Sequence, residues 1–408
     1  MSRQPLKRRK SALCLDFSTD FVRLPSFHLT HWEKTTETDW IAVLEPNSAC
    51  YLCPICLRAS TNHARPGRRI LRHRFVPSWG TVWVSVPVYR QRCASCGLTW
   101  TVEWNGIPPR GLVTSAFQEM AVDMCRGRDL LSVAKQLSVA YSTLERWYYQ
   151  LAPQRLAQPK EHEAPEVVCL DEFALQKGHK YGVNLMDAQT GHIWQVTEGR
   201  SREQVRNALQ QWPFRKAPHV VVTDLAPGMA ETVRQVWKHT LVVADKFHVI
   251  QLFSKALEAT RKRTHARGTH RRGRHEQRLL HTIPDKLKPE ELQELKNWLA
   301  EDPHLKRLYF ALQDIRTVYA VQTQEAGEEA LQKWIDDHLY SPTPAVRSIA
   351  KTIVQWREPI QNYFSFRVTN AKIEGTHNKV KVIKRRAYGY RNLERFKIRI
   401  RLECKPAT

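Results

Sequence analysis

The stretch Val167-Val-Cys-Leu-Asp171 has two counterparts further along the chain, Val220-Val-Val-Thr-Asp224 and Leu241-Val-Val-Ala-Asp245. Short apolar runs without polar alternation predict strands that are covered on both faces, as in a sheet with parallel strands. A carboxylate directly after such a strand lies at the edge where α/β sheets place their chemistry. The three runs therefore predict a buried sheet with an acidic site at one edge.

The segments between these runs predict the other elements of the same domain. Residues 180–187 and 192–198 have strand character and are joined by a turn-rich loop, which predicts a hairpin. Residues 202–212 and 228–237 carry apolar side chains at helical spacing. A hairpin followed by β-α units is the chain order of the ribonuclease H-like fold, in which the first and fourth strands are neighbours. We therefore expect the acids at the ends of these two strands to face each other and to share a divalent cation.

A third acid is expected from a helix predicted over residues 370–384. Glu374, Asn378 and Lys381 recur along one face of that helix. A carboxylate suits a metal ion, and the amide and the lysine one and two turns later suit phosphate. Glu374 is therefore the best candidate to complete the acidic site.

The chain has an excess of positive charge. Its 408 residues include 64 Lys+Arg against 40 Asp+Glu, which gives a net charge of +24. The densest basic runs lie at 261–278 and 379–401, and residues 1–10 form a short basic arm. Such runs favour a polyanion, most often nucleic acid, although a well-solvated surface is the plainer alternative. The candidate DNA contacts are Arg261, Lys262, Arg263, Arg271, Arg272, Asn378, Lys379, Lys381, Lys384, Arg385 and Arg386.

The nine cysteines are interpreted as residues of a reducing compartment. We find no signal peptide and no apolar run long enough to span a membrane, so a cytoplasmic location is expected and paired cysteines are read as metal ligands first. Cys53-Pro-Ile-Cys56 and Cys93-Ala-Ser-Cys96 supply four thiolates for a structural Zn²⁺. Val82, Val84, Val86 and Val88 alternate between the two pairs, as in a hairpin. Cys50 leaves the ligand register ambiguous, and buried free cysteines are the alternative.

Residues 111–153 are predicted to form helices joined by a tight turn, which matches a helix-turn-helix. Ser142-Thr-Leu-Glu145 has the form of a capping box that starts the recognition helix, residues 142–150. Ser142, Thr143 and Arg146 are its candidate DNA contacts. A plain helical hairpin is the competing interpretation.

The predicted organisation is a multidomain α/β chain with a large helical insertion. The segments are a basic leader at 1–48, a zinc ribbon at 49–110, the helix-turn-helix at 111–153, the first part of a ribonuclease H-like core at 154–249, an α-helical insertion at 250–366, and the rest of the core, with Glu374, at 367–408.

Taken together, these motifs resemble bacterial insertion-sequence transposases of the ISL-three group, in the DDE superfamily. The residues that carry the resemblance are the two cysteine pairs, Leu170-Asp-Glu-Phe173, Thr223-Asp224, Asp245-Lys-Phe-His-Val-Ile250, Ile373-Glu-Gly-Thr-His-Asn-Lys379 and Lys384-Arg-Arg-Ala-Tyr-Gly-Tyr-Arg-Asn392. The resemblance covers nearly the whole chain from Cys53 onward. It implies that Asp171, Asp224 and Glu374 are the catalytic triad and that DNA-binding modules precede the catalytic domain.

The expected chemistry is two-metal phosphoryl transfer on double-stranded DNA with Mg²⁺ or Mn²⁺. Asp171 is expected to contact both ions, and Asp224 and Glu374 one each. Asp245 and His248 are secondary candidates, the first as a rival of Asp224 and the second as a phosphate contact or a helix cap. A homodimer is expected, because two element ends must be held together. The alternatives are a ribonuclease H-like nuclease or resolvase and a domesticated, non-catalytic DNA-binding regulator.

Overall fold

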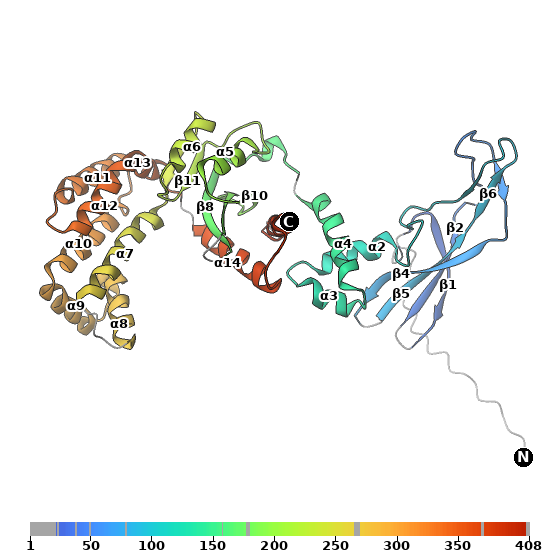
Figure 1. Cartoon of the computed structure of the whole chain (residues 1–408), viewed down its shortest axis with the longest axis horizontal. Helices are drawn as coiled ribbons and strands as arrows, with labels where there is room; N and C mark the ends of the chain where they lie inside the picture. Colours follow the sequence, from blue (N-terminus) through green and yellow to red (C-terminus); the bar gives the residue numbers. More distant parts are fainter. Residues whose placement is uncertain are drawn as a thin grey trace, which may run out of the picture. The chain divides into compact units, whose positions relative to one another are not determined.

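The computed structural model describes residues 22, 24–36, 39–48, 50–77, 80–156, 158–176, 180–264, 270–368 and 371–404, without the side chains of 176, 264, 270–272 and 371–374. The chain divides into two compact units, residues 1–154 and 155–408 (Figure 1). Among the described residues, no helix combines the length and the apolar character that a membrane span requires.

The first unit is built on a four-stranded sheet with the order β1-β2-β5-β4. Its strands are β1 (Phe27–Lys34), β2 (Trp40–Pro46), β4 (Gly67–Val76) and β5 (Gly80–Val88). The alternation predicted in β5 is confirmed, since Val82, Val84 and Val86 are buried. The boundary predicted at residue 48 is wrong, because β2 pairs in parallel with β5 and the two sides of that boundary share one sheet and one core.

A second, three-stranded sheet in this unit presents the cysteine pairs. It consists of β3 (Ser60–Asn62), β6 (Arg90–Cys93) and β7 (Thr99–Thr101) in the order β3-β6-β7. Cys93 ends β6 and pairs with Ser60, the first residue of β3. This pairing brings the two cysteine pairs, which are far apart in the sequence, to one end of the sheet.

The first unit also contains the helices α2 (Ser115–Met124), α3 (Leu130–Gln136) and α4 (Tyr141–Leu151). The turn between α3 and α4 contains Ser138 with a φ of 49°, the left-handed conformation that glycine adopts most readily. The predicted capping box at Ser142 is wrong. Helix α4 begins one residue earlier, its N-cap is Ala140, and no side chain caps it.

His73 ties this helical bundle to the first sheet. The ring is fully buried; Nε2 donates to the carbonyl of Val22 (2.6 Å), and Nδ1 accepts from the hydroxyl of Thr114 (3.0 Å). Thr114 in turn is the N-cap of α2 and accepts from the Phe117 amide. Burial lowers the pKa of His73 to about 4, so the imidazole is neutral and one tautomer satisfies both bonds.

The second unit contains a five-stranded sheet with the order β10-β9-β8-β11-β12. Its strands are β8 (Val167–Gln176), β9 (Lys180–Asp187), β10 (Ile193–Val196), β11 (Val220–Thr223) and β12 (Leu241–Ala244). The predicted pairing of the first and fourth strands is confirmed, because β8 and β11 are parallel neighbours. Strand β8 is longer than predicted: it continues to pair with β9 beyond the end of β11, so Asp171 lies within the strand rather than after it.

Helices cover both faces of this sheet. On one face, α5 (Arg202–Gln210) and α6 (Met229–Val236) pack against Leu170, Leu185 and Val221. On the other face, α7 (Lys246–Thr264) and α13 (Arg357–Phe366) pack against Val222 and Val243. Burial on both faces explains why the strands contain continuous apolar residues.

The helical insertion shares a core with the second face of the sheet. Its further helices are α8 (His270–His281), α9 (Pro289–Glu301), α10 (Pro303–Val318), α11 (Gln324–His338) and α12 (Pro344–Gln355). Leu308, Leu331 and Ile353 belong to the same buried cluster as Val222 of the sheet. The boundary predicted at 249/250 is wrong, because it falls inside α7; the end predicted at 366 coincides with the end of α13. Helices α14 (Ala371–Arg386) and α15 (Leu393–Glu403) follow.

Candidate active site and metal centres

Three side chains from different elements meet at the edge of the five-stranded sheet. Asp171 lies in β8, Asp224 directly follows β11, and His248 lies in the first turn of α7. One ligand atom from each lies within 4.8 Å of the other two. Backbone amides fix both carboxylates: the Glu172 amide donates to Asp171 (2.7 Å), and the Ala226 amide donates to Asp224 (3.1 Å).

The carboxylates of this site are buried and close together, so their negative charges are unfavourable. Burial raises the pKa of Asp171 to about 7; the positive charge of His248 opposes the shift, and Asp224 adds to it. Burial also raises the pKa of Asp224. A divalent cation would remove this unfavourable excess of negative charge, and carboxylate oxygens are the ligands that Mg²⁺ prefers. The residues present therefore fit a divalent cation.

Asp245 holds His248 in place. Its carboxylate is only 1% exposed and lies 3.0 Å from Nδ1 of His248. Burial alone would lower the pKa of His248, but this hydrogen bond and the nearby carboxylates outweigh burial and raise it. With Nδ1 donating to Asp245, Nε2 is left for the acidic site. Asp245 is therefore buried away from solvent, and its hydrogen bond holds the imidazole in one orientation.

Helix α14 reaches the site through His377, which the sequence analysis did not single out. Nδ1 of His377 lies 3.7 Å from a carboxylate oxygen of Asp171. Its Nε2 accepts from the Asn184 amide group (2.9 Å), which lies opposite Asp171 on β9. Burial and the charges of Lys381 and His248 lower the pKa of His377 to about 4, so the ring is neutral and its proton is on Nδ1, facing Asp171.

The predicted third acid lies on the same helix as His377. Glu374 is within α14, three residues before His377, and its side chain is outside the described residues. Residues three apart on a helix share a face. Placing Glu374 at the site therefore remains a prediction, which the position of His377 supports.

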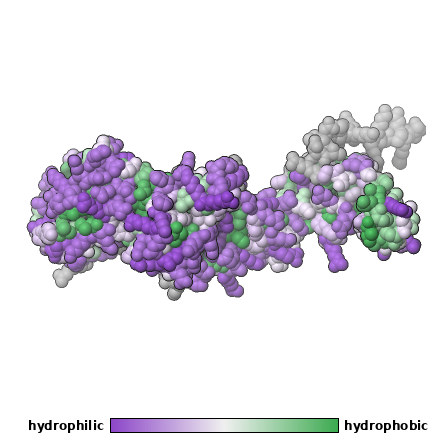
Figure 2. Space-filling view, turned by 90° about the horizontal axis from the view of Figure 1, so that it is seen from above, coloured by the Kyte–Doolittle hydropathy of each residue, from purple (hydrophilic) through white to green (hydrophobic). Residues whose placement is uncertain are grey.

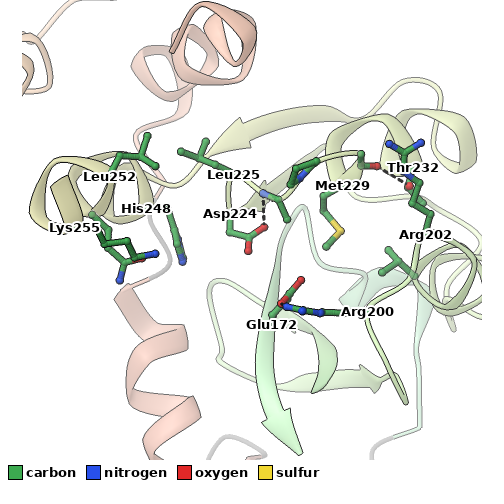
Figure 3. A pocket seen from close by; sticks show the side chains of 15 residues that line it. Glu172, Arg200, Arg202, Asp224, Leu225, Met229, Thr232, His248, Leu252 and Lys255 are labelled. Carbon is green, nitrogen blue, oxygen red and sulfur yellow. Dashed lines mark hydrogen bonds and ion pairs between the residues drawn. The ribbon is translucent and has the colours of Figure 1, made fainter. Parts of the chain in front are cut away.

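A cavity of about 520 Å³ adjoins the acidic site (Figure 3). Asp224 and His248 lie beside each other on one side, and Arg200 extends to Glu172, with a 2.9 Å ion pair between them. Arg202 and Lys255 also line the cavity. Glu172 adjoins Asp171 in the sequence but does not belong to the cluster of possible metal ligands. Arg200, Arg202 and Lys255 were missed because they lie outside the dense basic runs at 261–278 and 379–401.

The four predicted zinc ligands lie together in the first unit. Sγ of Cys53 is 3.5 Å from Sγ of Cys96, and Sγ of Cys56 is 3.4 Å from Sγ of Cys93. Four sulfurs around a zinc ion at Zn–S distances of about 2.3 Å are about 3.8 Å apart, so this set fits zinc. Cys50 is exposed and is not part of the group, which resolves the ambiguity of register.

Both cysteine pairs have the same backbone. In each pair, the first cysteine accepts from the amide four residues later and donates to the carbonyl five residues later, at 2.8–3.0 Å. The residue after each pair, Leu57 or Gly97, has a positive φ, 55° or 72°. Such turns aim both thiolates of a pair at one point, as a metal knuckle requires.

The predicted DNA contacts of the first unit lie on one side of α4. Ser142 and Arg146 are exposed and Thr143 is half-buried, while Leu144, Trp147 and Tyr148 are buried. The exposed residues of α4 are therefore available to a ligand.

The basic runs of the second unit are only partly available. Arg261 is buried and bonded to Glu258 and Glu276, so the prediction that it contacts DNA is wrong. Arg386 forms an ion pair with the buried Glu403, and its charge is likewise occupied. The side chains of Arg271 and Arg272 are outside the described residues. The predicted contacts that are exposed or half-buried are Lys262, Arg263, Asn378, Lys379, Lys381, Lys384 and Arg385. Hydrophilic residues dominate the face of the molecule in Figure 2.

The part of the chain that forms the acidic site is similar to a known protein family. A family model for ISL-three DDE proteins, described as "Transposase", matches residues 168–400, which is more than half of the chain. The chain belongs to this transposase family. The match includes the whole of β9–β12, the helical insertion and α14, so the elements that form the acidic site all lie within the family domain of the transposase.

Curated relatives extend this result to the first unit. The transposase for insertion sequence element IS1001 of Bordetella parapertussis is 24% identical over 371 residues, which cover 88% of this transposase and 90% of the relative. The transposase for IS1557 of Mycobacterium tuberculosis is 25% identical over 253 residues, covering 55% of this chain and 57% of the relative. Both are similar DNA-transposition proteins, and the first spans both units.

Proposed function

We propose that this transposase cleaves the ends of its insertion sequence and joins the freed 3′-hydroxyls to target DNA. The observation that carries the proposal is the convergence of Asp171, Asp224 and His248 at the end of two parallel strands. The sheet order and the pairing of β8 with β11 support a ribonuclease H-like catalytic core. Water would attack first, and the resulting hydroxyl would attack the target phosphate at the same site.

The acidic residues are proposed to hold Mg²⁺ or Mn²⁺. Asp171 would contact two ions, and Asp224 and Glu374 one each. Divalent ions bound there supply charge stabilisation for the phosphoryl transition state and activate the attacking oxygen. The backbone amides that bond Asp171 and Asp224 keep their oxygens in fixed positions, so little reorganisation is needed when the ions bind.

Neighbouring residues are proposed to orient the acids and the DNA. Asn184 fixes the ring of His377, whose Nδ1 proton faces Asp171 and limits the rotation of that carboxylate. Lys255 lines the cavity beside Asp224, where its charge would bind a phosphate next to the one that is cleaved. Arg200 and Arg202 line the same cavity and are paired with Glu172 and Glu231.

The first unit is proposed to recognise DNA as a zinc ribbon followed by a helix-turn-helix. Ser142, Thr143 and Arg146 would contact the double helix from α4, with the buried Leu144 and Trp147 anchoring that helix. The exposed residues of the basic runs would bind phosphates of the element ends and of the target. We propose a homodimer, since both ends must be held during joining, and a bacterial cytoplasmic location with binding to the nucleoid.

A strand-transfer assay tests the proposed function. The wild-type protein, loaded with zinc, is incubated with Mg²⁺, pre-cleaved element ends and a supercoiled target plasmid. We expect covalent joining of the ends to the plasmid, and none when Ca²⁺ replaces Mg²⁺. Cleavage of uncut ends without joining would instead indicate a nuclease or resolvase, and protection of DNA without either reaction would indicate a regulator.

A further inference from the structure

Tyr388 has an unusual position at the end of α14. Its side chain is 99% exposed, and its φ is 52°. A residue with a Cβ atom disfavours this left-handed conformation, which glycine adopts freely. The left-handed residue closes α14 as the C-caps of many helices do, and the observation that remains is a large aromatic ring left fully exposed to solvent.

The loop that carries Tyr388 is well ordered by its own hydrogen bonds. The Tyr388 amide donates to the carbonyl of Arg385 (3.0 Å), and the Gly389 amide donates to that of Lys384 (3.1 Å). On the far side of the loop, Asn392 caps α15, and the ring of Tyr390 stacks on Phe396 with centroids 4.6 Å apart. The loop therefore packs Tyr390 inward and holds Tyr388 outward, so the exposure of Tyr388 follows from the structure of the turn.

Several basic residues lie within a few positions of Tyr388 in the sequence. Among the described residues, Lys384, Arg385 and Arg391 form no ion pair, whereas the neighbouring Arg386 is paired with Glu403. Lys384 and Arg391 line a cavity of about 460 Å³ together with Lys180 and Tyr390. An exposed aromatic ring with cations close to it along the chain is the combination that binds single-stranded nucleic acid, because bases stack on the ring and phosphates meet the cations.

The geometry points to a base-stacking site: Tyr388 stacks on an unpaired base of the DNA substrate, and Lys384, Arg385 and Arg391 bind the phosphates beside that base. This inference rests on the proposed function, since it assigns a further contact to the same substrate. Inside a duplex every base is stacked on both faces, so the ring selects DNA that is opened or overhanging near the site of cleavage.

The length of α14 gives the distance along the helix between the acidic site and the loop that carries Tyr388. His377 contacts Asp171, and Arg386, the last residue of the helix, follows it nine positions later. At 1.5 Å per residue this distance is about 14 Å. Successive nucleotides of one strand are about 3.4 Å apart, so a strand that ran along α14 would bring a base about four nucleotides from the scissile phosphate to Tyr388.

The test uses the full-length, zinc-loaded protein and two probes, a blunt DNA duplex and the same duplex with a short 3′ overhang that contains 2-aminopurine. The decisive variant is Tyr388→Gly, because glycine relieves the strained φ and removes the ring at once. We expect this variant to be at least as heat-stable as the wild type. Its Kd for the overhang probe should rise about tenfold or more, and the quenching of 2-aminopurine on binding should disappear. Its affinity for the blunt duplex should change by less than about twofold.

Two further variants complete the experiment. Tyr388→Phe keeps the ring and should retain the wild-type affinity and quenching. Tyr340→Ala removes another tyrosine, which is 86% exposed at the end of α11, and should change neither probe. Wild-type affinity and quenching in Tyr388→Gly would overturn the inference while leaving the proposed function intact. A wild-type protein that binds neither probe would overturn both.

Discussion

An Asp171→Asn protein should bind DNA as tightly as the wild type and lose at least about a thousandfold of its strand-cleavage rate with Mg²⁺. The reason is that the amide keeps the shape of the side chain and removes the negative charge that would hold both ions. Cleavage of labelled element ends by equal concentrations of the two proteins measures the effect.

The same substitution should leave the apo protein as stable as before or make it more stable. Burial raises the pKa of Asp171 to about 7, far above its usual value, so at neutral pH and above the ionised carboxylate destabilises the folded state. Asparagine has no charge to bury, so thermal unfolding without metal should occur at the same temperature or higher. A rate loss that accompanies a lower unfolding temperature would instead indicate misfolding.

Glu172→Gln is the matched control for this experiment. Glu172 is the adjacent acid on β8, but it pairs with Arg200 and is outside the cluster of possible metal ligands. We expect it to retain cleavage within about tenfold of the wild type. Equal losses in both variants would contradict the assignment of Asp171 as a metal ligand.

The second large effect concerns the four cysteines. A Cys93→Ser protein should lose its zinc ion and, with it, the folded three-stranded sheet that carries both cysteine pairs. Structural zinc sites contribute about 10–16 kcal/mol of binding free energy in small zinc domains, which is far more than a three-stranded sheet can replace. Zinc content by atomic emission and proteolysis of the purified proteins measure the two losses.

Cys50→Ser is the control for the zinc experiment. Cys50 lies three residues before Cys53, so it has the same sequence spacing as a ligand pair, but it is exposed and outside the cluster. This variant should keep one zinc ion per chain and the wild-type proteolysis pattern. Loss of zinc from Cys50→Ser together with full zinc in Cys93→Ser would refute the proposed ligand set.

The sequence allowed the sheet and much of the site to be predicted, for physical reasons. Strands that are buried on both faces must be apolar throughout, so β8, β11 and β12 are visible as short runs that end near acids. The four-cysteine set is visible because knuckles need close spacing. Both signals are local, and both concern residues whose chemistry is distinctive.

The features that were missed depend on contacts between distant residues. Asn184 and His377 are 193 residues apart, and only the folded chain brings them to Asp171. Arg261 belongs to a basic run, yet Glu258 and Glu276 neutralise it inside the protein, which no count of charges reveals. The start of α4 was misplaced because its N-cap is Ala140, which has no side chain that can cap a helix.

The central claim is that Glu374 joins Asp171 and Asp224 around divalent ions, and binding of Mn²⁺ to the full-length protein tests it most directly. Electron paramagnetic resonance of free Mn²⁺ gives the number and affinity of bound ions, independently of DNA cleavage. We predict that Glu374→Gln weakens Mn²⁺ binding at least about tenfold, as Asp224→Asn does, while Glu172→Gln has no effect. Wild-type Mn²⁺ binding by Glu374→Gln, alongside weakened binding by Asp224→Asn, would contradict the three-acid site.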